Sequence, residues 1–263
     1  MKDLNHVSTA TDAAAVATTT PTNGAFNYKP VINKKRGRRK QPQTVSLKES
    51  IESRIESLVA SKFYSELLDL LATKVCKLPF HDIVCYGIGT LSSRISQFQF
   101  ALLLKLREIL EITGKVYIYD PIFTTEDHDV LAHYDMLLIP TNERAKRPIS
   151  LPTLFYMPHC SQTLYSNLLG SNWSQEKLEK LVLIGNRIEK YAENNTEATL
   201  NRKAPYLLPS LTLLQCVEFP SSFEDNCVFN DTCWQSFDPE KIMTVDDGFW
   251  DEREVTENDT ELI

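Results

Sequence analysis

Residues 83–106 read IVCYGIGTLSSRISQFQFALLLKL, and this stretch decides the fold class. An apolar run leads to Gly87 and Gly89, hydroxyl residues follow, and apolar side chains then recur at helical spacing between Ser92 and Ile112. This order is typical of a buried strand, a tight loop and a helix, and Gly114 is predicted to end the helix. The loop has two open interpretations: it binds an anion at the positive end of the helix, or its glycines only let the strand and the helix pack closely.

The alternation of strand and helix continues toward the C-terminus. Short apolar runs bounded by polar, Gly or Pro residues predict strands within residues 81–87, 115–120, 135–142, 152–160, 181–186 and 212–219. Helical patterns separate them, including residues 125–134, for which Thr125 is the expected N-cap. Nearly continuous apolar strands between helices predict a parallel sheet covered on both faces. The predicted fold class is therefore α/β, a three-layer Rossmann-like domain with a mostly parallel sheet.

Segments of different charge flank this domain, which is predicted to span residues 46–238. Residues 1–45 hold too few large apolar groups to form a core and are predicted to be a disordered basic arm, with eight Lys and Arg against two Asp. Residues 239–263 form an acidic tail with nine acidic residues against two basic ones. The total charge of −7 leaves −6 for the domain. Because a nucleic-acid-binding surface is basic, no sequence-specific nucleic-acid partner is expected.

A leading helix is predicted at the start of the domain, within residues 46–75. Its apolar residues recur at steps of three and four, with Ser46 as the cap and an interruption near Lys62. Its apolar stripe either faces the core or docks a partner helix.

A compact basic run, KKRGRRK from Lys34 to Lys40, is a candidate nuclear-import signal or a solvated charge cluster. The N-terminus has no apolar signal-peptide core and no apolar run reaches ~18 residues, so neither secretion nor membrane binding is expected. The six cysteines include no CxxC pair and none with His at zinc-finger spacing, so no metal site is expected. The predicted location is the cytoplasm, the nucleus or both.

Polar residues follow the predicted strands at the edge where open parallel sheets bind ligands. They are Gly87, Gly89, Thr90 and Ser92 after the first strand, Asp120 after the second, Thr141, Asn142 and Glu143 after the third, His159 and Cys160 after the fourth, and Gly185 and Asn186 after the fifth. We expect these residues to lie close together and to form the mouth of one ligand-binding cleft. The ligand-binding candidates are Gly87, Gly89, Thr90, Ser92, Asp120, Asn142 and Asn186.

The glycine loop matches part of the dinucleotide fingerprint. Ser92 stands where the third glycine is expected, and Asp120 lies 31 residues after Gly89, where the fingerprint has an acidic residue after about 20. Because the intervening helix is long, Asp120 can still end the neighbouring strand and bind a ribose hydroxyl, as in dinucleotide or adenosylmethionine sites. Alternatively, the glycines serve packing and Asp120 caps a loop beside Pro121. The cofactor is therefore unknown, with a nucleotide-type ligand as the candidate.

His159 and Cys160 are the candidate catalytic residues. They end a strand and precede a helix, whose N-terminus lowers the pKa of a nearby thiol. Adjacent residues of an extended chain point to opposite sides, so a direct Cys–His pair is not expected. His159 is expected to face the cleft for acid–base chemistry or ligand contact, while Cys160 or Ser161 caps the helix.

Several longer runs carry a resemblance to a known family. They are VCYGIGTLSSRISQFQFALLLKL, VYIYDPIFTTED, PTLFYMPHCSQTLYSNLLGSNW, LVLIGN and, at residues 228–237, VFNDTCWQSF. Over roughly residues 70–238 the chain resembles the Sensitivity to Red Light Reduced family. The resemblance implies a Rossmann-like domain and a regulatory role in light and circadian-clock input, clock-gene expression and haem biosynthesis. It implies no established reaction.

The chain departs from the family pattern at two places on the rim of the expected mouth. The family tends to have Asn-Glu-x-Gly after the third strand, whereas residues 142–145 read NERA. It tends to have Gly-Asn-Ser-Phe after the fifth strand, whereas residues 185–188 read GNRI.

Three functional hypotheses follow. The leading one is a circadian and haem-linked regulator whose glycine loop and Asp120 sense a nucleotide-like or other small anionic ligand. The second is an enzyme, a transferase or hydrolase using His159 with Asp120 or Cys160, although the sequence leans against catalysis. The third is a protein-interaction scaffold that docks partners on the helix at residues 47–71. Protein partners are expected in addition to any small-molecule ligand.

Overall fold

The computed structural model describes residues 45–75 and 78–256. The basic run from Lys34 to Lys40 lies outside the described residues, as does Cys76. The import signal and the character of the N-terminal arm therefore stay predictions. None of the described helices is both long and apolar enough to span a membrane.

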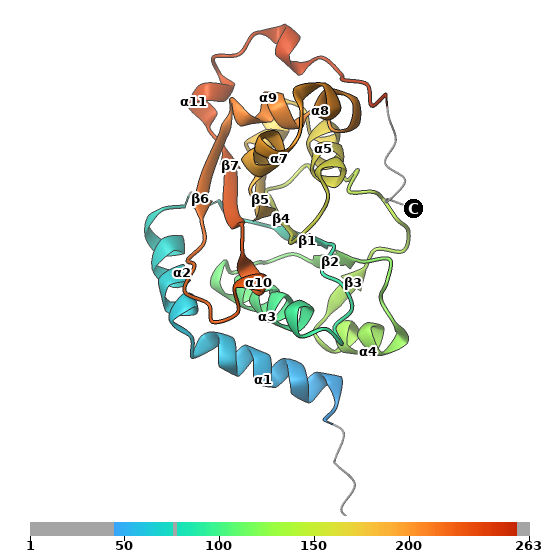
Figure 1. Ribbon diagram of the computed structural model, residues 1–263, viewed down its shortest axis with the longest axis vertical. Helices are drawn as coiled ribbons and strands as arrows, with labels where there is room; N and C mark the ends of the chain where they lie inside the picture. Colours follow the sequence, from blue (N-terminus) through green and yellow to red (C-terminus); the bar gives the residue numbers. More distant parts are fainter. Residues whose placement is uncertain (1–44, 76–77, 257–263) are drawn as a thin grey trace, which may run out of the picture. The chain divides into compact units, whose positions relative to one another are not determined.

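A seven-stranded sheet organises the described part of the chain (Figure 1). Its strands are β1 (Asp82–Tyr86), β2 (Val116–Tyr119), β3 (Met136–Leu138), β4 (Thr153–Met157), β5 (Leu181–Asn186), β6 (Leu214–Glu218) and β7 (Thr232–Phe237). They lie in the order β3-β2-β1-β4-β5-β7-β6. Strands β1 to β5 run parallel, and β7 runs antiparallel to both of its neighbours. The predicted mostly parallel α/β fold is confirmed, although β7 was not predicted as a strand.

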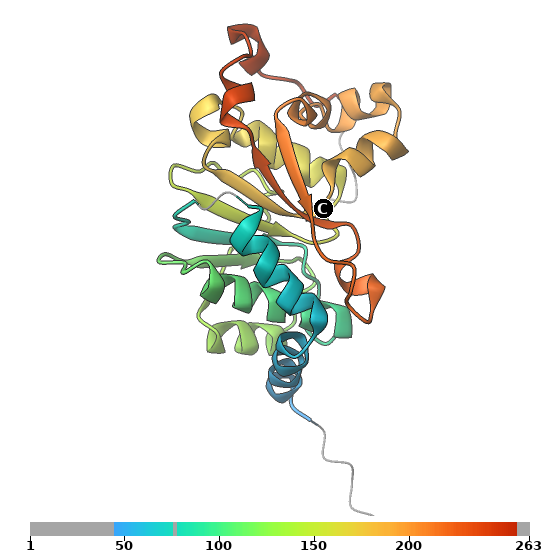
Figure 2. The same cartoon turned by 90° about the vertical axis from the view of Figure 1, so that its left-hand side faces the viewer.

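Helices cover both faces of the sheet (Figures 1 and 2). One face carries α1 (Leu47–Val59), α2 (Lys62–Thr73), α3 (Arg94–Ile109), α4 (Thr125–His133) and α10 (Asn226–Phe229). The other carries α5 (Gln162–Ser171), α6 (Gln175–Leu178), α7 (Ile188–Asn194), α8 (Glu197–Lys203), α9 (Leu207–Leu211) and α11 (Pro239–Ile242). Two apolar cores result, one on each face of the sheet.

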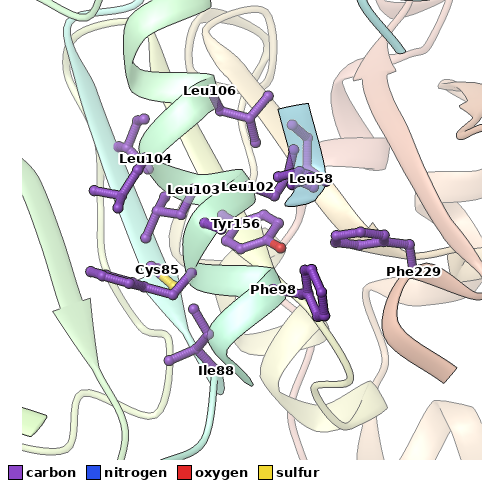
Figure 3. Packing of buried hydrophobic residues seen from close by; sticks show 14 of the residues in the cluster. Leu58, Cys85, Ile88, Phe98, Leu102, Leu103, Leu104, Leu106, Tyr156 and Phe229 are labelled. Atoms are coloured by element: carbon purple, nitrogen blue, oxygen red, sulfur yellow. The ribbon is translucent and has the colours of Figure 1, made fainter. Parts of the chain in front are cut away.

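Alternating strand residues supply the two cores. In β4, Tyr156 joins the core under α3 and Phe155 joins the core under α5. Figure 3 shows Cys85 and Tyr156 of the sheet beside Leu102 and Leu103 of α3. Because both faces are buried, the strands read as continuous apolar runs and do not alternate with polar residues.

The leading helix is divided in two and faces the core. Ser46 caps α1 through a capping box with Glu49, and Ser61 caps α2 just after the break. Ile51 and Phe63, from the predicted stripe, are fully buried. Packing against the domain therefore accounts for this stripe, in agreement with the core-facing interpretation.

Two predicted helix ends are wrong. Helix α3 ends at Ile109, and Glu111 adopts a φ of +50° beyond it. Gly114 has another role: a Cβ there would lie 2.5 Å from the carbonyl oxygen of His81. The cap of α4 is Thr124, one residue before the predicted position, because its hydroxyl accepts the N–H of Asp127 in a capping box.

Candidate functional site

The carboxyl ends of the five parallel strands meet at one edge, where their loops contact each other directly. Gly89 N–H donates to Asp120 Oδ2 at 2.7 Å, which joins the loops after β1 and β2. The N–H of His159 donates to Asn186 Oδ1 at 3.0 Å, which joins the loops after β4 and β5. The structure thus brings the candidates of these loops to a common mouth.

The strand order reverses at β1, since β2 lies on one side of it and β4 on the other. In open α/β sheets this reversal marks the ligand crevice. Gly87 leaves β1 with a φ of +72°, and a Cβ on it would lie 2.6 Å from Cys160 Sγ. Gly87 therefore allows the loop after β4 to pack against the loop after β1 at this point.

Carboxylates already occupy two N–H groups of the glycine loop. Gly89 is held by Asp120, and the N–H of Leu91 donates to Asp127 Oδ1 at 2.8 Å. The Thr90 hydroxyl donates to Asp127 Oδ2 at 3.0 Å. A phosphate at this loop would have to displace or approach these carboxylates, which like-charge repulsion opposes.

Ser92 and Ser93 lie at the start of α3. The Ser92 hydroxyl lies 3.1 Å from the Thr90 hydroxyl, and Ser93 is the N-cap residue without a side-chain capping bond. Arg94, the first helical residue, forms an ion pair with Asp225. Ser92 therefore takes part in the loop and does not cap the helix.

Asp120 is half-buried and has a structural role in addition to its position at the mouth. Its Oδ1 accepts the N–H of Ile122 at 3.1 Å, the loop cap that was one of the two interpretations. Each carboxylate oxygen has two lone pairs, so acceptor capacity remains for a hydroxyl donor. Asp120 can therefore cap its own loop and still accept a hydrogen bond from a ribose hydroxyl.

Glu143, after β3, belongs to a partly buried ion pair. Arg147 donates to both of its oxygens, at 2.9 and 2.7 Å, and the Tyr86 hydroxyl donates at 2.7 Å. Burial, together with the Glu143 charge, raises the pKa of Tyr86 well above its ordinary value. Nearby, Asn142 Oδ1 accepts the N–H of Arg144 at 2.9 Å, while Thr141 is exposed. These contacts fix the loop after β3.

The two candidate catalytic residues lie in different environments. His159 is exposed and adopts a φ of +55°. Cys160 is 5% exposed, and its thiol donates to the carbonyl of Tyr86 at 3.4 Å. Burial, with a contribution from the Asp120 charge, raises the pKa of Cys160 far above the ordinary thiol range. A protonated, buried thiol is a poor nucleophile, so the geometry disfavours Cys160 in that role.

Asn186 connects three segments around the mouth. Its backbone N–H donates to the Tyr165 hydroxyl at 2.8 Å, and that hydroxyl donates to the carbonyl of Met157 at 2.6 Å. Its side-chain amide donates to the Tyr191 hydroxyl at 2.9 Å. Burial raises the pKa of Tyr191 to about 12. Neither tyrosine was a candidate from the sequence, because each hydroxyl binds one segment nearby and one 21 or 31 residues away, which only the folded chain brings together.

A cavity of about 580 Å³ lies at the same edge, beside the ends of β5, β6 and β7. Its lining residues are Arg187, Lys190, Glu218, Phe219, Pro220, Ser221, Phe223, Asp225, Asn226, Phe229, Asn230, Asp231 and Thr232. Sequence reasoning missed it, since none of these residues was a candidate. The closely spaced phenylalanines at 219, 223 and 229 are the signal that was available. Within the described ranges, no group of three or more His, Cys, Asp or Glu side chains is arranged to hold a metal ion.

Fold and mouth together define a doubly wound, Rossmann-like α/β protein. The SRR1 domain matches residues 47–236, and the chain therefore belongs to the SRR1 domain family. This confirms the resemblance found in the sequence.

The chain is similar to proteins from a plant, an insect and a mammal. The chain is 29% identical to "Protein SENSITIVITY TO RED LIGHT REDUCED 1" of Arabidopsis thaliana over 206 residues, which are 73% of this chain and 74% of the relative. It is 27% identical to an SRR1-like protein of Drosophila melanogaster over 214 residues, 77% of this chain and 74% of the relative. It is 36% identical to an SRR1-like protein of Mus musculus over 127 residues, 47% of this chain and about half, 51%, of the mouse protein.

Among solved structures, a putative Zn-dependent alcohol dehydrogenase from Rhodobacter sphaeroides aligns at 12% identity over 76% of this chain and 85% of that chain. The TM-score of this alignment is 0.26.

Proposed function

We propose that this protein is a regulator whose mouth binds a nucleoside ligand without net negative charge, of the adenosylmethionine type. The Gly89–Asp120 contact carries the proposal, because it places a carboxylate where a dinucleotide would place its phosphate. A carboxylate at the end of the second strand suits ribose hydroxyls, which donate hydrogen bonds to it. The anionic ligand expected from the sequence is less compatible with this arrangement.

The charge around the mouth supports a neutral or cationic ligand. Asp120 follows β2 and Asp127 lies in the first turn of α4, and both accept hydrogen bonds from N–H groups of the glycine loop. In a phosphate-binding loop, these N–H groups would donate hydrogen bonds to the phosphate. A sulfonium cation near two carboxylates gains Coulomb energy where a pyrophosphate loses it.

The sheet offers a second, weaker line of support. Its first five strands follow the dinucleotide-binding order, while the antiparallel β7 lies between β5 and β6. Rossmann-like methyltransferases that bind adenosylmethionine share this order. This is an analogy of fold and does not by itself assign an activity.

The process in which the protein acts is proposed from its relatives. The name of the Arabidopsis relative refers to red-light sensitivity. We propose a regulatory role of that kind, with circadian-clock input and haem biosynthesis as the processes that the family resemblance implies. Protein partners and a nuclear or cytoplasmic location belong to this proposal as well.

Isothermal titration calorimetry of the full chain tests the ligand. Adenosylmethionine and adenosylhomocysteine are expected to bind, whereas ATP and NAD⁺ bind much more weakly or not at all. Asp120→Asn is expected to weaken adenosylmethionine binding by roughly 10-fold or more, because a hydrogen bond to a charged group contributes about that much binding free energy. The matched control is Asp129→Asn, an exposed residue of α4, which should bind as the wild type does. Preferential binding of ATP or NAD⁺, or unchanged affinity in Asp120→Asn, would contradict the proposal.

Methyl transfer is a second candidate function, within the transferase alternative raised by the sequence. The cavity of about 580 Å³ favours it, because it offers space for an acceptor at the same edge of the sheet. The test incubates the protein with adenosylmethionine and a cell extract and follows the formation of adenosylhomocysteine over time. Formation above that of a control with heat-denatured protein would show methyl transfer in addition to binding.

A further inference from the structure

Two cysteines face each other diagonally on the last two strands of the sheet. Cys216 of β6 lies opposite Gln235 of β7, and Cys233 precedes Gln235 by two residues. Directly opposite residues of antiparallel strands share a face, as do residues two apart on one strand. Cys216 and Cys233 therefore project from the same face of the sheet.

The two thiols differ in access to solvent. Cys216 is half-buried on an edge strand, whereas Cys233 is 1% exposed. The Cys233 thiol lies 3.6 Å from the carbonyl oxygen of Gly185 on β5. An oxidant can therefore reach Cys216 more readily than Cys233.

Arg187 adds a positive charge beside this pair. It follows β5, and its guanidinium is paired with Glu218, the residue directly opposite Cys233. Two further carboxylates, of Glu189 and Glu193, lie 3.8 Å from it. A hydrogen bond from Cys233 is the main cause that lowers the pKa of Cys216, and Arg187 assists it. Burial and the charges of Glu189 and Glu218 oppose this shift. The same hydrogen bond, with burial, raises the pKa of Cys233.

We propose that Cys216 is a peroxide-reactive thiol and that Cys233 resolves its oxidised form into a disulfide between β6 and β7. This modification site is independent of the proposed ligand. Reactive cysteines occur where a partly exposed thiol lies near a cation. Cys216 is partly exposed and has Arg187 nearby, with the charge of this guanidinium shared among three carboxylates.

The chemistry balances with hydrogen peroxide as the only oxidant. The Cys216 thiolate attacks one peroxide oxygen, the O–O bond breaks, and sulfenic acid and hydroxide result. The Cys233 thiol is buried and protonated, so it passes its proton to the sulfenic hydroxyl as its sulfur attacks the sulfenic sulfur. The S–O bond breaks and water leaves, and no free Cys233 thiolate is needed. Two thiol sulfurs are oxidised by two electrons in all, and peroxide is reduced to water and hydroxide.

Closing the disulfide requires a small movement of β6. A diagonal pair is more widely spaced than a directly opposite pair, so the Cα atoms must approach each other. Strand β6 is at the edge of the sheet, with β7 as its neighbour in the order, and its side chains are half-buried or exposed. An edge strand of this kind can shift without disturbing the rest of the sheet.

The test is peroxide treatment of the reduced full chain at neutral pH, followed by alkylation and peptide mass mapping. The wild type should form the Cys216–Cys233 disulfide, with a mass loss of about 2 Da, the two hydrogens removed when two thiols join. Cys233→Ser should stop at a Cys216 sulfenic acid, which dimedone traps. Cys216→Ser should form no disulfide with Cys233.

Cys227→Ser is the matched control, because Cys227 is exposed on α10 and lies outside the pair. This variant should still form the Cys216–Cys233 disulfide. Arg187→Gln should slow the alkylation of Cys216 by iodoacetamide, by roughly 3-fold or more, through loss of the cation. If Cys233→Ser does not fold, the relative oxidation rates of Cys216 and Cys227 in the wild type decide. Faster oxidation of Cys227 than of Cys216, or a reduced Cys216 after treatment, would overturn the proposal.

Discussion

Ala145 occupies the position at which the family pattern has glycine, and its φ is +57°. This left-handed conformation costs a residue with a Cβ about 1–2 kcal/mol, and glycine avoids most of that cost. The departure seen in the sequence is thus a glycine position filled by a strained alanine. The side chain is 1% exposed, so its methyl group contributes about 0.8 kcal/mol of burial in compensation.

Replacing Ala145 by glycine is therefore expected to change the free energy of unfolding little. Relief of strain offsets the lost methyl burial and the greater entropy of glycine in the unfolded chain, so the variant should lie within about 1 kcal/mol of the wild type. Urea unfolding monitored by tryptophan fluorescence measures this. The control is Ala132→Gly on the exposed side of α4, which should cost about 1 kcal/mol. A loss clearly larger at position 145 than at position 132 would contradict the account of strain.

Some features of the mouth could be predicted from the sequence and others could not. Asp120 and Asn186 were placed correctly at one edge, because the rule for parallel strands needs only the order of strands and helices. The pairing of Glu143 with Arg147 and Tyr86 could not be predicted, since it depends on where the loop after β3 folds back over β1. The occupation of the loop N–H groups by carboxylates was also beyond the sequence, because those partners lie more than thirty residues apart.

At the scale of elements, Asp127 joins the start of α4 to the loop before α3. It accepts hydrogen bonds from the Thr124 N–H and hydroxyl, the Leu91 N–H and the Thr90 hydroxyl, at 2.7 to 3.0 Å. Burial raises the pKa of this carboxyl, but these bonds outweigh burial and hold the pKa below its ordinary value. The Asp127 carboxylate thus links the N-terminus of α4 to the glycine loop by hydrogen bonds.

Asp127→Ala is expected to lower the free energy of unfolding by about 2–4 kcal/mol at pH 7, because several donors lose a charged acceptor. The pKa of this carboxyl is lower in the folded state than in the unfolded state. Its contribution is therefore fully present above the unfolded-state pKa of about 3.9 and is lost as the pH falls toward the folded-state value. Urea unfolding at pH 7 and at several pH values below 4.5 measures both effects.

The matched control is Asp129→Ala, which removes an exposed carboxylate from the same helix. It should change stability by less than about 0.5 kcal/mol, as surface substitutions do. The difference between the wild type and Asp127→Ala should shrink at the lowest pH values. A difference that is constant across this range would rule out the charged form of Asp127 as the source of the stability.

Neither the helices α7 to α9 nor the strand β7 was predicted from the sequence, and β7 shows why some strands are not predicted. It reads TCWQSF, with polar residues where a buried strand should be apolar. Gln235 is fully buried because it accepts the N–H of Ile188 and donates to the carbonyl of Asn186. A polar side chain whose partners lie on other segments looks like a surface residue in the sequence. By contrast, β1 to β5 were found because both of their faces are apolar.

At the scale of the whole described domain, the C-terminal segment is tied to the face that carries α5. The sequence predicted only an acidic tail from residue 239 onward, yet α11 and a 3₁₀ helix (Asp247–Trp250) form within its described part. The Trp173 indole N–H donates to the Phe249 carbonyl at 2.9 Å. Net charge could not reveal this attachment, because it depends on aromatic contacts and not on the acidic residues.

Arg253 contacts three aromatic side chains where the C-terminal segment packs on this face. Its guanidinium lies 5.0 Å from the ring centroid of Trp173, 5.5 Å from that of Phe249 and 5.8 Å from that of Tyr206. Its backbone N–H donates to the Tyr206 hydroxyl at 2.9 Å, and its Nη1 donates to the Phe249 carbonyl at 3.1 Å. Each cation–π contact of this kind contributes about 0.5–2 kcal/mol, depending on desolvation.

Arg253→Ala is therefore expected to release the C-terminal segment while the sheet stays folded. Amide hydrogen exchange should become faster in residues 246–256, by roughly 10-fold for a loss of about 1.4 kcal/mol of local stability, and remain unchanged in β4 and β5. Lys241→Ala, which removes an exposed cation from the same segment, should leave exchange as in the wild type. Arg253→Lys keeps the charge but loses the planar stacking, so its exchange rates should fall between the two. Unchanged exchange in Arg253→Ala would mean that the aromatic contacts among Trp173, Phe249 and Trp250 hold the segment without the arginine.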